Sequence, residues 1–167
     1  MPNWCSNQVT IEHDDPAQIQ RLFDAFEKGE FLQAVDPMPE NPPVDPAIAA
    51  EFYDSLPDWY NWRLAHWGTK WDVGGKHDGQ ADILTPNMLS LSFDSAWSPP
   101  MIAYQKLVND GFKVHAYYHE MGMCFMGEFD NGEDDYIEYT CYEDIPDNWD
   151  EVWNMAEMFA MMEEDGD

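Results

Sequence analysis

Hydrophobic spacing predicts that the N-terminal part of the chain folds as a strand followed by a helix. Residues 8–12 alternate between polar and apolar types, with Val9 and Ile11 on one face, which is typical of a half-buried strand. An Asp-Pro pair at 15–16 then favours a helix start. Apolar side chains follow every three or four positions, as one face of a helix requires: Ile19, Leu22, Phe23 and Phe26.

The middle of the chain alternates between breakers and short helical segments. Prolines crowd residues 35–46, exclude regular structure there and predict an extended surface loop. Residues 47–56 and 58–67 have the composition of short helices, and Pro57 favours the start of the second one. Glycines at 68, 74, 75 and 79 then predict a loop.

Strand patterns dominate the second half. Residues 81–84 and 88–93 alternate and predict two strands joined at 85–87. A helix is expected from the Ser-Pro-Pro sequence at 98–100 to Gly111, where a C-terminal glycine ends it.

Three further strands are expected at 112–120, 123–130 and 135–142, joined by a turn at 121–122 and by the Asn-Gly hairpin signal at 131–132. A last helix should begin at Asp147 or Asn148. We expect its apolar side chains to face inward: Trp149, Val152, Trp153, Ala156 and Phe159.

This order of elements predicts a single α+β domain over residues 1–167. Without an insert at about 30–79 and an acidic extension at about 130–167, the order is β-α-β-β-α-β, the layout of ferredoxin-like folds. We therefore expect an antiparallel sheet with helices on one face, an added hairpin and a C-terminal helix.

The net charge of the chain is the sequence feature that indicates most about its partners. The chain has 34 acidic and 7 basic residues, a formal net charge of −27, yet 44% of its residues are hydrophobic and 15% aromatic. Such a chain folds, so the acidity belongs to a folded surface. Direct binding to nucleic acid or to an anionic membrane is disfavoured, and basic partners are favoured. The alternative is that the acidity only aids solubility or reflects a salt-rich habitat.

Cysteine usage and the chain start indicate a compartment. Cys5, Cys124 and Cys141 are odd in number and lie in apolar stretches, which favours reduced thiols over a disulfide framework. The first residues have neither a basic segment nor an apolar run, and no later stretch approaches membrane-spanning length. We expect a cytoplasmic protein.

Three motifs carry a resemblance to a known family. They are MPNWCSN at 1–7, WYNWRLAHWGTKWD at 59–72 and DSAWSPP at 94–100. Together they resemble the Api-ninety-two-like family of phage, plasmid and genomic-island proteins. The resemblance implies a ferredoxin-like domain, a mobile-element origin and hence a host bacterial cytoplasm. It implies no activity and no catalytic residues.

A tryptophan-rich segment is the first candidate site. Trp59, Trp62, Arg63 and His66 fall at i, i+3, i+4 and i+7, so they share one face of a helix. Such a wall of rings with polar groups could hold a nucleobase or another flat ligand. The alternative is that the tryptophans fill the core. The full candidate set is Trp59, Trp62, Arg63, His66, Trp67, Lys70, Trp71, Asp72 and Trp97.

The sequence supports no catalytic, cofactor or metal site. His115 and His119 lie two strand steps apart, roughly 13 Å, so they cannot share a metal. The acidic run at 130–135 lacks the ligand spacing of a calcium-binding loop. No nucleophile elbow, P-loop or dinucleotide-binding glycine pattern occurs.

The acidic C-terminal part is the second candidate site. No lysine or arginine follows Lys113, and Asp150, Glu157 and Glu164 recur every seven residues, or about 10 Å along a helix. These acids could imitate a track of phosphates. The alternative is a solvated helix face. The expected partner-binding residues are Glu133, Asp134, Asp135, Glu143, Asp144, Asp147, Asp150, Glu151 and Glu157.

The favoured hypothesis is therefore a non-enzymatic protein of a mobile element. It would inhibit or modulate a basic, nucleic-acid-binding host protein of the defence type by imitating DNA or RNA charge. The alternative is a small-ligand or nucleotide-binding protein, including an enzyme, that uses the tryptophan-rich segment.

Overall fold

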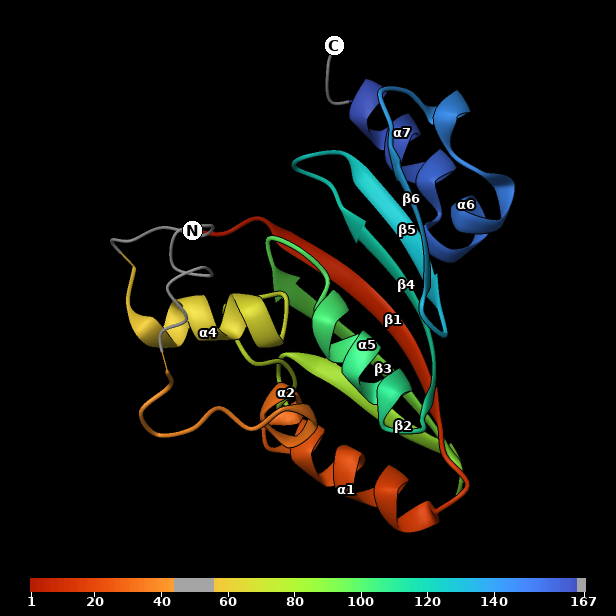
Figure 1. Ribbon diagram of the computed structural model, residues 1–167. Coiled ribbons are helices and arrows are strands. Elements are labelled where there is room, and N and C mark those ends of the chain that lie inside the picture. The colour runs from red at the N-terminus through yellow and green to blue at the C-terminus, as the bar shows by residue number, and fades with distance from the viewer. Residues whose placement is uncertain (44–55, 165–167) are drawn as a thin grey trace.

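Six antiparallel strands form one open sheet, with helices packed against it (Figure 1). The computed structural model of the chain describes residues 1–43 and 56–164. The strand order is β2-β3-β1-β4-β5-β6, and every neighbouring pair is antiparallel. The strands are β1 (Trp4–Glu12), β2 (Gly79–Thr85), β3 (Met88–Ala96), β4 (Lys113–Glu120), β5 (Phe125–Asp130) and β6 (Glu133–Glu138). The protein is thus of mixed α+β class, as predicted.

The helices begin and end close to the expected positions in most places. Those described are α1 (Pro16–Glu27), α2 (Phe31–Val35), α4 (Asp58–His66), α5 (Met101–Asn109), α6 (Asp147–Trp153) and α7 (Met155–Glu164), with a 3-10 turn η1 (Tyr142–Asp144). The start of α1 confirms the expected cap, because the Asp15 side chain accepts a hydrogen bond from the Ala17 amide at 2.9 Å. The predicted helix at 47–56 falls almost entirely outside the described residues.

The first core lies on one face of the sheet, beneath α1, α2 and α5. The strict alternation of β1 buries Val9 and Ile11, and the register places Leu89, Leu91 and Ala116 of the neighbouring strands beside them. The apolar stripe of α1, with Ile19, Leu22 and Phe26, packs onto this surface. Burial of these side chains is the main force that holds the helices to the sheet.

A second core lies on the opposite face, at the β4–β6 end. Met126 of β5 points away from the first core, and Trp149 of α6 and Met155 of α7 pack against it. The added C-terminal segment, for which the sequence predicted no face, therefore covers the face opposite α1, α2 and α5. On this face β5 carries the apolar Met126 and β4 carries the ring of Tyr117, and the C-terminal helices cover both.

The single C-terminal helix expected from the apolar periodicity was wrong. Asn154 adopts a left-handed conformation, with φ 51° and ψ 49°, and divides the segment into α6 and α7. Asparagine tolerates this conformation better than most residues. The break turns Met155 into the second core and leaves Ala156, expected to face inward, exposed.

Two further boundaries differ from the prediction. The proline-rich segment is preceded by the short helix α2, whose first turn is capped by a residue far along the chain, as described below. Strand β6 ends at Glu138 rather than at 142, because the chain then turns into η1: the Thr140 and Cys141 amides donate to the Asp144 carboxylate at 2.9 Å and 3.2 Å. The Asn-Gly hairpin was correct, since Asn131 and Gly132 both have positive φ.

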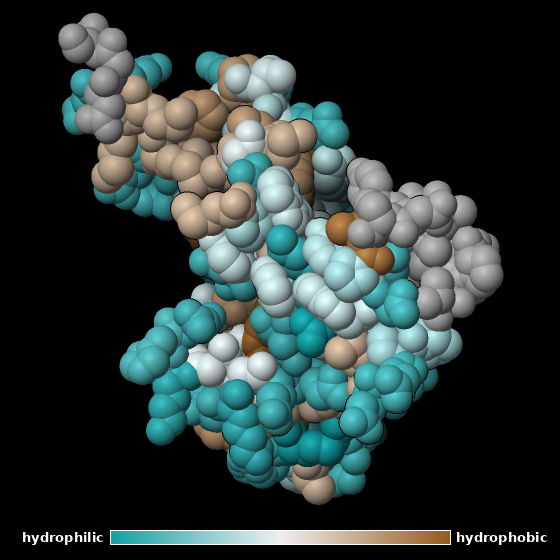
Figure 2. Space-filling model, turned by 90° about the vertical axis from the view of Figure 1, so that its left-hand side faces the viewer, coloured by the Kyte–Doolittle hydropathy of each residue, from teal (hydrophilic) through white to brown (hydrophobic). Residues whose placement is uncertain are grey.

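Hydrophobic residues are unevenly distributed over the surface. Figure 2 shows hydrophobic colour gathered at the end of the molecule that carries α7, where Met161 and Met162 are 55% and 60% exposed. The part of the same view below this end is mostly hydrophilic. A hollow separates the two parts on that side of the molecule.

Candidate functional site

The nine predicted partner-binding acids do lie on the surface, grouped at one end of the molecule. They come from β6, η1, α6 and the first turn of α7, and all but Asp150 are exposed. Strand β6 is the last strand of the sheet, so its acids border a sheet edge. We call this set the acidic surface, and it consists of Glu133, Asp134, Asp135, Glu143, Asp144, Asp147, Asp150, Glu151 and Glu157.

Several of these carboxylates have structural contacts. Asp134 accepts the Tyr118 hydroxyl at 2.6 Å, and Asp144 accepts the Thr140 amide at 2.9 Å. Asp150 accepts the Tyr142 hydroxyl at 2.7 Å, and Glu157 accepts from the Asn154 side chain. The hydrogen bonds that Asp144 accepts from Thr140 lower the pKa of its carboxyl below the usual range. These acids therefore help to fold the C-terminal segment.

The acidic surface does not form the predicted regular row. Asp150 lies on α6, whereas Glu157 and Glu164 lie on α7, and the left-handed Asn154 separates the two helices. A seven-residue spacing keeps side chains on one line only along an unbroken helix. The prediction of one carboxylate line through these three residues was wrong. The charge remains, but its geometry is that of a patch.

The tryptophan-rich segment is largely packed against itself. The rings of Trp62 and His66 stack with centroids 4.0 Å apart, and the His66 Nδ1 lies 3.0 Å from an Asp36 carboxylate oxygen. Trp67 is 1% exposed and donates its indole Nε1 hydrogen to the Asp36 carbonyl at 2.9 Å. Trp62 and Trp67 therefore belong to the first core, which was the alternative reading of their spacing.

Arg63 is held between rings instead of facing solvent. Its guanidinium lies 5.1 Å from the Trp59 ring centroid and 4.8 Å from that of Trp67, and it donates to the Lys70 carbonyl at 3.1 Å. Burial lowers the pKa of Arg63, and the nearby Asp72 opposes this shift. Arg63 is thus a structural cation in this conformation.

Asp72 caps helix α2 from a distance. Its two carboxylate oxygens accept the Leu32 and Gln33 amides at 2.7 Å and 3.0 Å, which are first-turn donors of that helix. Burial raises the pKa of Asp72, although the amide hydrogen bonds favour its charged form. This long-range contact explains why α2 forms without a side-chain cap of its own, and it could not be predicted from local sequence.

The backbone around Trp97 lies close to the tryptophan-rich segment, but the Trp97 side chain does not pack into it. The Thr69 hydroxyl donates to the Ala96 carbonyl at 2.8 Å, and the Ser98 hydroxyl donates to the Gly68 carbonyl at 2.7 Å. Trp97 itself is 47% exposed and has a positive φ of 70°. The two segments are therefore neighbours, while the Trp97 ring is not part of the core.

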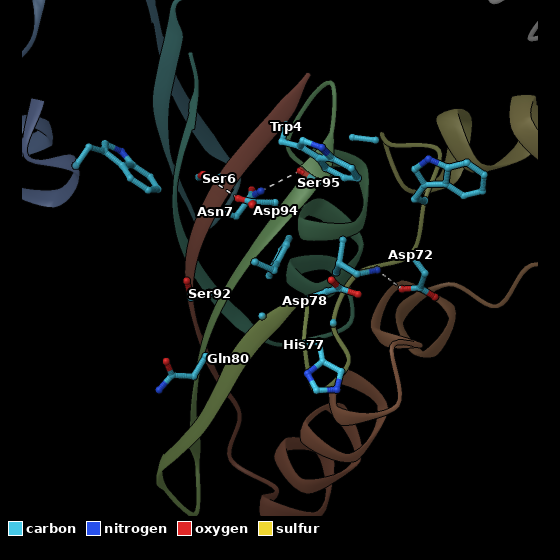
Figure 3. A pocket seen from close by; sticks show the side chains of 17 residues that line it. Trp4, Ser6, Asn7, Asp72, His77, Asp78, Gln80, Ser92, Asp94 and Ser95 are labelled. Atoms are coloured by element: carbon cyan, nitrogen blue, oxygen red, sulfur yellow. Dashed lines mark hydrogen bonds between the residues drawn. The ribbon is translucent and has the colours of Figure 1, made fainter. Parts of the chain in front are cut away.

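A pocket of about 680 Å³ lies beside β3, between the loop before β2 and the end of α6. Figure 3 shows Trp4, Ser6 and Asp94 at one end of it and His77 and Gln80 at the other. Of the predicted ligand residues, only Trp71 and Asp72 line this pocket. Sequence reasoning missed Trp4 and Asp94. The available signal was the polar alternation of the first and third strands, which leaves one sheet face for polar side chains.

The histidines of β4 serve separate contacts. The Nε2 of His115 lies 2.8 Å from a Glu128 carboxylate oxygen, and the buried His119 pairs with the Tyr139 hydroxyl at 2.8 Å. Burial raises the pKa of Glu128, but hydrogen bonds from His115 and Trp149 outweigh it, so that pKa lies below its usual value. Within residues 1–43 and 56–164 no three metal-binding side chains cluster.

Together these features define a protein of mixed α+β class with an open six-stranded antiparallel sheet, an acidic surface at one edge and a pocket beside β3. Across the described part of the chain, no helix has the length and apolar character needed to cross a bilayer.

Comparison with known proteins adds little to this description. No family model matches the chain, and no curated protein matches it. A solved structure that is similar is a protein api92 from Yersinia pseudotuberculosis, with 12% identity and a TM-score of 0.47 over 84% of this chain and 99% of that one. It has the name of the family that the sequence motifs resemble. At this TM-score and identity, the likeness supports no statement about shared function.

Proposed function

We propose that the protein is a non-enzymatic binding protein that uses its acidic surface to bind a basic protein that normally handles nucleic acid. One observation carries the proposal: no lysine or arginine follows Lys113, while the nine acids of the acidic surface gather on one end of the molecule. An uncompensated field of this kind attracts a basic partner and disfavours nucleic acid itself.

Five of the acids have no part in the structural hydrogen bonds described above, and one of these, Glu143, interacts with the Cys141 side chain. Four remain. They are Glu133 and Asp135 on β6 and Asp147 and Glu151 on α6, and all four are exposed. Their charges are presented by a hairpin and a helix whose side-chain hydrogen bonds named above do not involve them, so little ordering entropy is lost when a partner binds. These four residues are the centre of the proposed interface.

The finer parts of the proposal rest on the sequence motifs and the strand order. The order β2-β3-β1-β4, with α1 and α5 in the connections, supports a ferredoxin-like assignment for the part before β5. The resemblance of the motifs supports an origin in a phage or another mobile element, and with it action on a host defence protein in the bacterial cytoplasm. The net charge of −27 supports a role in DNA or RNA charge mimicry.

The test is affinity capture from a bacterial lysate at low salt with two matched variants. The first carries Glu133→Gln, Asp135→Asn, Asp147→Asn and Glu151→Gln. The control carries Asp14→Asn, Asp24→Asn, Glu27→Gln and Glu40→Gln, which remove four exposed charges at the opposite end of the chain. We expect the first variant to lose the captured protein and the control to retain it. Added duplex DNA should also release the captured protein from the parent, since both compete for one basic surface.

Equal capture by both variants would refute the proposed interface. If neither added DNA nor higher salt released the captured protein, charge mimicry would be refuted. Loss of capture on Trp59→Ala, with the acids intact, would favour the tryptophan-rich segment. That ligand site remains the alternative, now restricted to its more accessible members such as Trp71.

A further inference from the structure

We propose that the pocket beside β3 binds a small organic cation that carries an ammonium group, held between the ring of Trp4 and the carboxylate of Asp94. We call it the β3 pocket. It goes beyond the proposed function, because it shares no residue with the acidic surface.

The floor of the β3 pocket is the polar face of two paired strands. Trp4 pairs with Ala96 and Ser6 pairs with Asp94, so these four side chains lie on the face opposite the first core. The Ser6 hydroxyl donates to the Asp94 Oδ1 at 2.8 Å and fixes that carboxylate on the floor (Figure 3). Its other oxygen is left to accept from a ligand.

Trp4 supplies an accessible aromatic face beside this carboxylate. Its side chain is 50% exposed, which is unusual for the largest apolar side chain. Trp4 and Asp94 are diagonal neighbours on antiparallel strands, a relation that separates Cβ atoms by about 7–8 Å or somewhat less. A quaternary ammonium group fits between an aromatic face and a carboxylate at that spacing.

The second wall already shows a cation on an aromatic ring. Trp71 stacks on Trp59 with centroids 5.6 Å apart, and the Lys70 ammonium lies 5.5 Å from the Trp71 centroid. Trp71 is therefore engaged by the chain itself and forms the outer boundary of the β3 pocket. Trp153 also lines the β3 pocket but packs against the second core, which leaves Trp4 as the ring that a ligand can use.

The charge of the lining selects the sign of the ligand. Asp72, Asp78 and Asp94 line the β3 pocket, whereas no lysine or arginine does so among the described residues. Asp72 is engaged with helix α2, so Asp78 and Asp94 set the local field. An anion such as a nucleotide phosphate is repelled here, and a cation is attracted. The volume of about 680 Å³ falls in the range of small-molecule sites.

The loop that closes the β3 pocket depends on glycines. Gly74 has a φ of 100°, and a Cβ on Gly79 would come within 2.6 Å of the Ser92 carbonyl oxygen. Only glycine allows both the turn and the close approach to β3. The wall that carries Asp78 is therefore built into the fold and does not need a ligand to form.

The experiment compares choline with 3,3-dimethylbutan-1-ol, a neutral molecule of the same shape. Binding is measured by isothermal titration calorimetry and by shifts of the tryptophan indole N–H signals in NMR, with sodium chloride exchanged for choline chloride at constant ionic strength. We expect choline to bind with a Kd of about 1 mM or below and the alcohol not to bind. Asp94→Asn and Trp4→Ala should each weaken choline binding about fivefold or more.

Two matched control variants distinguish binding at this site from the general effect of removing one negative charge or one exposed ring. Asp24→Asn removes an equal charge from α1, and Tyr136→Ala removes a ring that is 47% exposed on β6; neither residue lines the β3 pocket. Both should bind choline like the parent. The proposal is overturned if the alcohol binds as well as choline, if choline does not bind, or if Asp94→Asn leaves the affinity unchanged. Asp94→Asn should still capture the protein partner, so the two proposals fail separately.

Discussion

At the scale of single residues, the tryptophans show that surroundings decide a role that residue type leaves open. Trp67 and Trp97 lie in segments that are neighbours in the folded protein, yet the Trp67 side chain is 1% exposed and that of Trp97 is 47% exposed. Trp67 also satisfies its indole N–H within the protein, through the Asp36 carbonyl. A large ring with a satisfied donor inside a core is a stability residue.

These two residues give a prediction for stability. Trp67→Ala should lower the free energy of unfolding by about 3–5 kcal/mol, because it empties a packed position in the first core. Trp97→Gly should change it by less than about 1 kcal/mol, since the lost partial burial is offset by relief of a left-handed backbone. Urea denaturation followed by circular dichroism measures both. Similar losses for the two variants would contradict the assigned roles.

The sequence predicted part of this cluster and missed the rest for a physical reason. Spacing at i and i+4 correctly placed Trp62 beside His66 on α4. It could not show that Asp36, thirty residues earlier, would approach both His66 and Trp67. Contacts of that range depend on the whole fold, so burial within the cluster was open from sequence alone.

At the scale of elements, two asparagines with positive φ differ in how well the local sequence predicts their conformation. Asn131 precedes Gly132 between two strand patterns, and this local signal predicted the hairpin correctly. Asn154 sits within continuous apolar spacing that is typical of one helix. The break there lets Met155 pack inside the second core, and that packing depends on residues far away in the sequence.

The helix break yields a second prediction. Asn154→Ala should destabilise the protein by about 1 kcal/mol, because alanine is disfavoured in the left-handed conformation. Asn154→Gly should stay within about 0.5 kcal/mol of the parent, since glycine adopts that conformation freely. Both variants lose the side-chain contact with Glu157, so the pair isolates the backbone effect. Thermal and urea unfolding provide the measurement, and equal stability of the two variants would contradict the explanation.

At the scale of the whole molecule, the charge is large and little of it is paired. Lys106–Asp110 is an exposed helix pair at 2.8 Å, and the other close pairs in the described part of the chain involve histidines. A net charge of −27 on a chain of 167 residues opposes a compact state through self-repulsion. Composition alone predicted this property, because net charge does not depend on the fold.

The third prediction concerns salt. Raising sodium chloride from about 0.02 M to about 0.5 M should raise the Tm by about 3 °C or more, because screening shortens the range of repulsion between surface charges. The variant with Glu133, Asp135, Asp147 and Glu151 neutralised should start from a higher Tm and gain less. Differential scanning calorimetry checks both. A Tm that does not depend on salt would show that repulsion contributes little.

Strand β4 is the feature that links the two ends of the sheet. Ala116 faces the first core and Tyr117 packs against the second, although they are adjacent in sequence. The side chains of such neighbours therefore pack against separate groups of residues on the two faces of the sheet. The C-terminal helices and the surface they carry can therefore diverge toward new partners while the packing beneath α1 and α5 stays the same.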